Sequence, residues 1–235
     1  MNRVFYLSFI CFAVLVTACN LEKDKETDPD RIYFDYQVTG EEGNDNLTIL
    51  LQYRDGGEDE DAISTGSSTS VTLDGEMIPP DSTRSGGIFY EMHKPIDAFT
   101  GKHQIVFTGP GKKEYREEFS FQPVRLLTVL PDTIHRADLV FEFEGLSGGT
   151  PTEETEGSIR VLLTDTSFIN DGINHLEKAK DGRIVIPVTD LDRLANGPVQ
   201  LVFTREIQRP VRKGTDEGGR LLITYTLKRE FFLTD

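Results

Sequence analysis

Apolar and polar residues alternate along most of the chain after residue 30, and this period of two predicts β-strands. The clearest run spans residues 101–108, where Ile105 and Phe107 share one face and Gln104 and Val106 the other. Successive side chains of a strand point to opposite faces of its sheet, so this run suits a strand with one buried face. Sustained helical spacing is almost absent. The pattern therefore predicts an all-β protein.

Residues 31–123 are expected to form the first of two tandem β-sandwich domains. Turn signals such as Asp74-Gly75 separate its short alternating runs. An Asp-Gly turn, the strand Gly-x-His-x-Ile-x-Phe from Gly101, the glycine turn at 109–111 and an aromatic final strand together resemble immunoglobulin-like domains of secreted bacterial proteins. About seven short strands over about 90 residues are typical of that sandwich.

Residues 124–235 are expected to form a second β-sandwich domain, which begins after a proline at the boundary. Its two longest strands are expected at 199–207 and 220–227, joined by a polar connector over 208–219. The two halves show no convincing internal repeat. The sequence therefore predicts two different sandwiches in a row.

The first eighteen residues have the pattern of a secretory signal peptide. Arg3 supplies a positive start, and the 15 residues from Val4 to Ala18 are almost all apolar. A helix needs about 20 apolar residues to span a bilayer, so this stretch suits the core of a cleaved signal peptide better. Residues 1–18 are therefore expected to be absent from the folded protein.

A cysteine directly follows this apolar stretch, in the sequence Val16-Thr17-Ala18-Cys19. These residues resemble the lipobox of bacterial lipoproteins, with Val16 where leucine is usual. The resemblance implies that Cys19 is the lipid attachment site and that a diacylglycerol anchor holds the protein on a membrane. The alternative is an ordinary signal peptide with a chance cysteine. The one other cysteine, Cys11, lies in the segment expected to be removed, so no disulfide is expected.

Residues 19–30 are expected to be the lipidated cysteine and a flexible tether, because they are polar, charged and interrupted by proline. The acidic and lysine-containing tether resembles the surface-export signal of Bacteroidota lipoproteins. Asp-Ser-Thr at 81–83 and Asp-Thr-Ile at 132–134 resemble the short O-glycosylation signal of exported proteins from that phylum. The resemblance implies an outer-membrane location, with the surface and periplasmic orientations both open.

The chain is strongly acidic, with a formal net charge of −15. Nucleic acid binding depends on basic surfaces that neutralise phosphates, so this charge excludes nucleic acid as an expected partner. The same charge disfavours lying flat on anionic lipid.

The densest acidic segment offers carboxylates that could bind calcium, which prefers several oxygen ligands on an adaptable loop. The run lacks the alternating ligands and central glycine of an EF-hand loop, so a solvated loop is the alternative. The candidate ligands are Asp55, Glu58, Asp59 and Asp61.

A basic segment near the C-terminus offers candidate anion-binding residues, Arg205, Arg209 and Arg212, followed by Lys213. Guanidinium groups can bind phosphate or carboxylate through two parallel hydrogen bonds. The alternative is local ion pairing with the acidic residues that lie alongside, Glu206, Asp216 and Glu217.

No motif for catalysis is visible. The four histidines lack zinc-type spacing, and the sequence contains no Gly-x-Ser-x-Gly and no phosphate-binding loop. No cofactor is therefore expected, and the chain is not expected to be an enzyme.

The sequence thus favours a lipid-anchored, non-catalytic binding or assembly module of the bacterial outer envelope, with another envelope protein as its partner. The first alternative is a surface glycan-binding lipoprotein, and a hydrolase with an unrecognised motif comes third. Without tryptophan, an aromatic platform for glycan would fall to tyrosines. The candidates are Tyr33, Tyr53, Tyr90, Tyr115 and Tyr225.

Overall fold

The computed structural model describes residues 29–60, 62–63, 69–83, 87–146, 158–165, 172–178 and 182–235. The expected signal peptide, Cys19 and nearly all of the expected tether lie outside these residues, so they stay predictions. Within the ranges described, no helix is long and apolar enough to cross a membrane.

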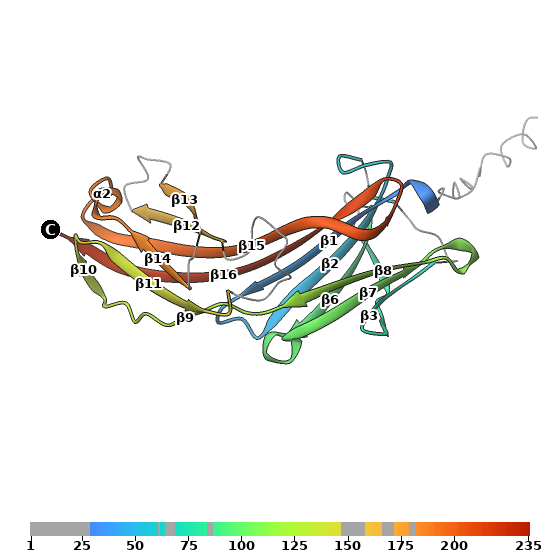
Figure 1. The fold of residues 1–235 in the computed structure, drawn as a ribbon, viewed down its shortest axis with the longest axis horizontal. Helices are drawn as coiled ribbons and strands as arrows, with labels where there is room; N and C mark the ends of the chain where they lie inside the picture. The colour runs from blue at the N-terminus through green and yellow to red at the C-terminus, as the bar shows by residue number, and fades with distance from the viewer. Residues whose placement is uncertain are drawn as a thin grey trace, which may run out of the picture.

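One long β-sheet runs the length of the molecule and forms a layer common to both halves (Figure 1). Among the described residues it has nine strands, and its two longest strands form the C-terminal hairpin. β10 (Thr133–His135) pairs with the end of β16 and lies off the main path. The main path runs in the order β13 (Ile173–Lys178), β12 (Ser158–Asp165), β15 (Gly197–Thr215), β16 (Gly218–Thr234), β1 (Ile32–Glu41), β2 (Asn46–Asp55), β6 (Gly87–Pro95) and β5 (Pro80–Thr83).

Two smaller sheets cover the same face of this long sheet, one in each half. The first consists of β4 (Glu76–Met77), β3 (Ser70–Leu73), β7 (Gly101–Thr108) and β8 (Glu114–Phe121). The second consists of β14 (Arg183–Ile186), β11 (Leu139–Glu144) and β9 (Arg125–Leu126). Four short helices complete the described elements: η1 (Pro29–Arg31), η2 (Ile96–Phe99), η3 (Pro110–Lys112) and α2 (Val188–Leu191). The prediction of an all-β protein with two sandwiches is confirmed.

Aromatic rings fill the core of the first sandwich. Phe34 of β1 and Tyr53 of β2 are fully buried, and both contact Phe107 of β7, with ring centroids 5.5 Å and 4.7 Å apart. Phe34 and Tyr36 of β1, and Leu51 and Tyr53 of β2, occupy alternate positions of their strands, so the period of two in the sequence directs these side chains to one face. Tyr115 of β8, in the small sheet, completes this group of rings, and its ring centroid lies 5.4 Å from that of Phe34.

The second sandwich has a smaller core centred on Phe203 of β15. The ring centroids of Phe141 and Phe143, both on β11, each lie 5.0 Å from that of Phe203. Leu201 on β15 and Val161 on β12 are fully buried as well. The same alternation that builds the first core therefore builds the second.

The C-terminal hairpin belongs to both sandwiches. β16 pairs in parallel with β1 from Phe34↔Gly219 to Glu41↔Thr226, while β15 pairs with β12 on the other side of the hairpin. Gly219 is suited to the first of these contacts, because it has a φ of 157° and an added Cβ would lie 2.4 Å from the Phe34 carbonyl oxygen. The boundary expected at residue 123 lies where the small sheets change, between β8 and β9, whereas the long sheet continues across it.

Candidate functional site

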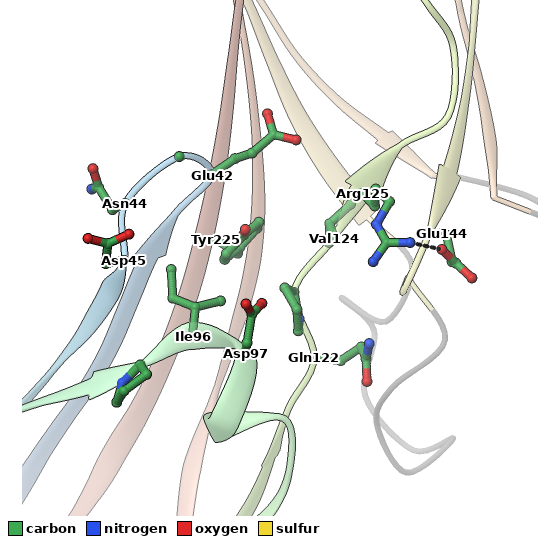
Figure 2. Close-up of a pocket in the computed structure, with 13 residues that line it drawn as sticks. Glu42, Asn44, Asp45, Ile96, Asp97, Gln122, Val124, Arg125, Glu144 and Tyr225 are labelled. Atoms are coloured by element: carbon green, nitrogen blue, oxygen red, sulfur yellow. Dashed lines mark hydrogen bonds and ion pairs between the residues drawn. The ribbon is translucent and has the colours of Figure 1, made fainter.

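The two sandwiches meet at an open cleft with a volume of about 460 Å³ (Figure 2). Its walls come from the turn between β1 and β2, from η2, from the linker between β8 and β9, and from β16. These segments are far apart in the sequence, and the parallel pairing of β1 with β16 brings them together. We refer to this cavity as the junction cleft.

Tyr225 of β16 lines the junction cleft although it is only 6% exposed. Its ring packs over the backbone of Gly40, where an added Cβ would lie 2.9 Å from the ring, and its centroid is 6.1 Å from that of Phe121. Burial raises the pKa of Tyr225, and the carboxylates of Glu42 and Asp97 raise it further. The hydroxyl is therefore neutral at physiological pH, and within the described part of the chain it has no hydrogen-bond partner.

Carboxylates dominate the polar groups of the junction cleft. Glu42 is bound by Arg229, whose Nη2 donates to Oε1 at 3.1 Å, and Glu144 is bound by Arg125 at 3.2 Å (Figure 2). The carboxylates of Asp45 and Asp97, in contrast, form no ion pair or hydrogen bond with any described residue. The junction cleft therefore carries negative charge that the chain does not neutralise.

Arg205 fixes the wall of the junction cleft from behind. It is 4% exposed, and its Nη1 donates to the carbonyl oxygens of Gly145 at 2.8 Å and Gln122 at 3.2 Å. Its Nη2 donates to the carbonyl oxygen of Leu146 at 3.3 Å. The guanidinium thus holds the linker between β8 and β9 against the end of β11, and its donors are directed at backbone rather than at solvent.

The other two arginines of the predicted anion site have separate surroundings. Arg209 is 7% exposed, its Nη1 lies 2.5 Å from Oε1 of Glu117, and its Nη2 donates to the carbonyl oxygen of Glu118 at 2.7 Å. Arg212 has an exposed side chain, and its backbone N–H donates to Oε2 of Glu117 at 2.7 Å. Arg205 and Arg209 are thus buried with partners inside the fold, and the principal acid is Glu117 of β8 rather than a neighbour in sequence. Anion binding by the three residues stays a prediction.

The predicted calcium ligands do not converge in the described part of the chain. Asp55 ends β2, Asp59 is exposed, and Glu58 forms an ion pair with Arg220 of β16. Asp61 lies outside the described residues. Within the described ranges no group of three or more acidic, histidine or cysteine residues is placed to hold a metal ion, so calcium binding stays a prediction.

A buried carboxylate, Asp35 of β1, lies on the opposite face of the long sheet from the aromatic core. It is 0% exposed and accepts hydrogen bonds from Nη2 of Arg54 at 3.0 Å and from Nε of Arg220 at 2.9 Å. Burial raises the pKa of Asp35, but the two arginines lower it by more, so the pKa lies below its usual value. Asp35 is therefore ionised in the folded protein and ties three neighbouring strands together.

Replacing Asp35 with asparagine is expected to weaken the dependence of stability on acid pH. Folding depresses the pKa of Asp35, so its charge stabilises the fold above the unfolded pKa of about 4. That contribution is lost as the pH falls through the lower, folded pKa. Urea unfolding measured from about pH 7 to about pH 2 should show a flatter profile for Asp35→Asn. Asp192→Asn, at an exposed carboxylate beside α2, should keep the wild-type profile, and equal slopes for Asp35→Asn and wild type would contradict the assignment.

The tyrosines considered for a glycan platform are mostly interior residues. Tyr53, Tyr90, Tyr115 and Tyr225 are at most 6% exposed, and only Tyr33 of the five is half-buried. These five tyrosines therefore do not form an exposed aromatic platform.

Exposed apolar side chains instead occur on β14 and on the segment that follows β9, at the smaller sheet of the second sandwich. Val129 is 90% exposed, Leu127 is 52% exposed and Val185 is 41% exposed. Val185 of β14 pairs with the half-buried Val140 of β11. The segment after β9 also lies beside β11, because the Leu127 N–H donates to the Glu142 carbonyl oxygen at 2.8 Å. We call these four residues, Leu127, Val129, Val140 and Val185, the apolar strip.

Comparison with known proteins finds no matching protein family and no matching curated protein. Among solved structures, the chain is similar to the two immunoglobulin domains of DIP-gamma, with 8% identity, a TM-score of 0.24, and coverage of 87% of this chain and 98% of that chain. The chain is also similar to the tandem immunoglobulin repeats of Dlar, with 10% identity, a TM-score of 0.25, and coverage of 83% of this chain and 97% of that chain. Similarity to the adhesin InvE of Yersinia pseudotuberculosis has 12% identity, a TM-score of 0.24, and coverage of 84% of this chain and 59% of that chain. Likenesses this distant establish no shared partner and no shared role.

Sequence reasoning singled out Tyr225 and Arg205 but assigned them to different sites, and it passed over Asp45 and Asp97. Asp45 belongs to a turn and Asp97 to a short helix, and the backbone N–H of Ile96 links the two segments by donating to the Asp45 carbonyl oxygen at 3.1 Å. No local pattern in the sequence indicates that contact. For Arg205 and Arg209 a signal did exist, because both share strand parity with the apolar Leu201, Phe203 and Ile207.

Proposed function

We propose that this chain is a lipid-anchored, non-catalytic binding module of the bacterial outer envelope and that its partner is another envelope protein. The observation that carries the proposal is the apolar strip. Exposed apolar side chains that gather in one region of a folded surface mark interaction sites, and Val129 is almost fully exposed to water. A protein partner would remove this surface from water.

The arrangement of the two ends of the fold supports a presenting role. The described chain begins at η1, beside the turn that joins β15 to β16, and the hydroxyl of Thr215 there donates to the carbonyl oxygen of Ile32. The C-terminus and the second sandwich lie at the opposite end of the long sheet (Figure 1). A lipid at Cys19 would hold the first sandwich toward the membrane and direct the apolar strip away from it.

Replacing Cys19 with alanine is expected to move the protein from the membrane fraction to the soluble fraction. Stable anchoring requires two or more acyl chains, and the proposal attaches all of them through this one residue. Cell fractionation followed by immunoblotting measures the change. Cys11→Ala is the matched control and should leave the protein on the membrane, and retention of Cys19→Ala on the membrane would refute the anchor.

A photo-crosslinking amino acid at Val129 is expected to capture one dominant envelope protein on intact cells. The same amino acid at Met77 serves as a control, because Met77 is 67% exposed but lies on β4 in the other sandwich. Mass spectrometry of the purified adducts identifies the captured proteins. The same set of adducts at both positions, or none at Val129, would overturn the proposal that the apolar strip binds a partner.

A further inference from the structure

The junction cleft and the apolar strip form neighbouring parts of one surface. Arg125 and Glu144 stand at the edge of the junction cleft as paired residues of β9 and β11, and Leu127 of the apolar strip follows two residues after Arg125. A protein that covers the apolar strip can therefore also reach the junction cleft. This inference rests on the proposed function and specifies the chemistry of the partner.

We propose that the junction cleft binds a lysine or arginine side chain of the protein partner. Its volume of about 460 Å³ falls within the range of about 300–1,000 Å³ found for ligand pockets. Asp45 and Asp97 present carboxylates without a cationic neighbour, so a cation that enters gains attraction without displacing an existing ion pair. The one basic residue in the lining, Arg125, is paired with Glu144.

Tyr225 gives the second, independent indication of a ligand. Tyr225 is 6% exposed as a residue, and its hydroxyl has no hydrogen-bond partner within the described part of the chain. The hydroxyl belongs to the wall of an open cleft, so an N–H group of a ligand can take the place of the water that would otherwise bind it. Because the raised pKa keeps the hydroxyl neutral, its oxygen can accept a hydrogen bond from an ammonium or guanidinium group.

The geometry favours an organic cation over a bare metal ion. A divalent metal needs several ligands around one point, and the described acidic residues form no such group. A lysine or arginine side chain carries several N–H donors, which can point toward separate acceptors at once. The carboxylates on the turn and on η2, together with the hydroxyl on β16, are acceptors of this kind (Figure 2).

The test uses the protein purified from membranes in detergent and measures binding by titration calorimetry. The probes are the acetylated and amidated tripeptides Gly-Arg-Gly and Gly-Lys-Gly, the citrulline tripeptide Gly-Cit-Gly as a neutral analogue of the arginine peptide, and spermine. We expect the arginine peptide to bind about tenfold more tightly than the citrulline peptide, because hydrogen bonds to charged groups are the stronger ones. Added salt should weaken binding of the arginine peptide.

Two variants locate the binding to the junction cleft. Tyr225→Phe keeps the ring on Gly40 and removes the hydroxyl, and it should weaken binding of the arginine peptide about tenfold. Asp97→Asn should weaken it about threefold to fivefold, as expected for one exposed charge pair. Asp192→Asn, outside the junction cleft, should bind as wild type does. If the circular dichroism spectrum shows that Tyr225→Phe does not fold, binding of the arginine peptide to Asp97→Asn alone tests whether the peptide binds in the junction cleft.

Equal binding of the arginine and citrulline peptides, or wild-type binding by Asp97→Asn, would overturn the inference. Spermine binding without binding of either basic peptide would also overturn it, since the ligand would then be a small polyamine. Failure of the proposed function is separate, because the crosslink at Val129 does not involve the junction cleft. A specific adduct at Val129 together with absent peptide binding refutes only this inference.

Discussion

Replacement of Arg205 by leucine is expected to lower the free energy of unfolding by about 3 kcal/mol. The guanidinium donates to the carbonyl oxygens of Gln122, Gly145 and Leu146, and leucine would leave these acceptors without that donor. These hydrogen bonds hold the linker between β8 and β9 and the end of β11 in place behind the junction cleft, and the substitution removes them. Urea unfolding followed by circular dichroism measures the change.

The control for Arg205 is Lys102→Leu, because the side chain of Lys102 is exposed and forms no hydrogen bond or ion pair with another described residue. This variant should stay within about 0.5 kcal/mol of wild type. Arg205→Lys should recover only part of the stability, because an ammonium cannot reproduce the planar fork of donors. Unchanged stability of Arg205→Leu, together with lost sulfate binding, would instead support the anion site considered from the sequence.

Replacement of Glu117 by leucine is expected to cost about 4 kcal/mol of stability. Glu117 is 2% exposed and faces Arg209, which is 7% exposed, so the substitution leaves a buried guanidinium without its counter-charge. It also removes the acceptor for the backbone N–H of Arg212. The same urea measurement quantifies the loss.

The double variant with both Glu117→Leu and Arg209→Leu separates the ion pair from the packing around it. When both charges of a buried pair are replaced by apolar groups, no unpaired charge remains, and stability is often kept. The double variant should therefore be more stable than Glu117→Leu alone. If the losses of the two single variants simply add, the two side chains are not coupled and the assignment of a buried pair is wrong.

Alternation in the sequence was enough to predict the strands that carry one buried face. Ile105 and Phe107 are fully buried as their parity requires, and the all-β class follows from many such runs. The predicted lengths of the last two strands, 199–207 and 220–227, were too short. β15 continues to Thr215 and β16 begins at Gly218, so strand fills most of residues 208–219, which the sequence presented as a connector because of Pro210 and its polar neighbours.

The reason for that error is the position of Pro210 in the sheet. β12 accompanies β15 only from Val199 to Arg205, so at Pro210 one side of β15 has no strand beside it in the described sheet. A proline is tolerated at such an edge, because the missing N–H removes no hydrogen bond between strands there. Edge and centre positions depend on which strands pair, and no local pattern in the sequence contains that information.

The junction cleft could not be predicted for a related reason. Tyr225, Asp45 and Asp97 lie on a strand, a turn and a short helix, and they meet only because β1 pairs in parallel with β16. Single-sequence patterns describe which face of a strand is buried but not which distant strand lies beside it. The charge pattern likewise identified the arginines on β15 but not the carbonyl groups and the glutamate that bind them.

The pairing of β1 with β16 also determines when this protein can fold. Asp35 of β1 and Arg220 of β16 are 185 positions apart and are neighbours in one sheet. Contacts between residues so far apart in sequence form slowly. A nascent chain in which β16 is still inside the ribosome lacks a central strand of its longest sheet. β16 must therefore be free to pair before either sandwich is complete, and a chaperone that shields the apolar strands meanwhile would suit this order of events.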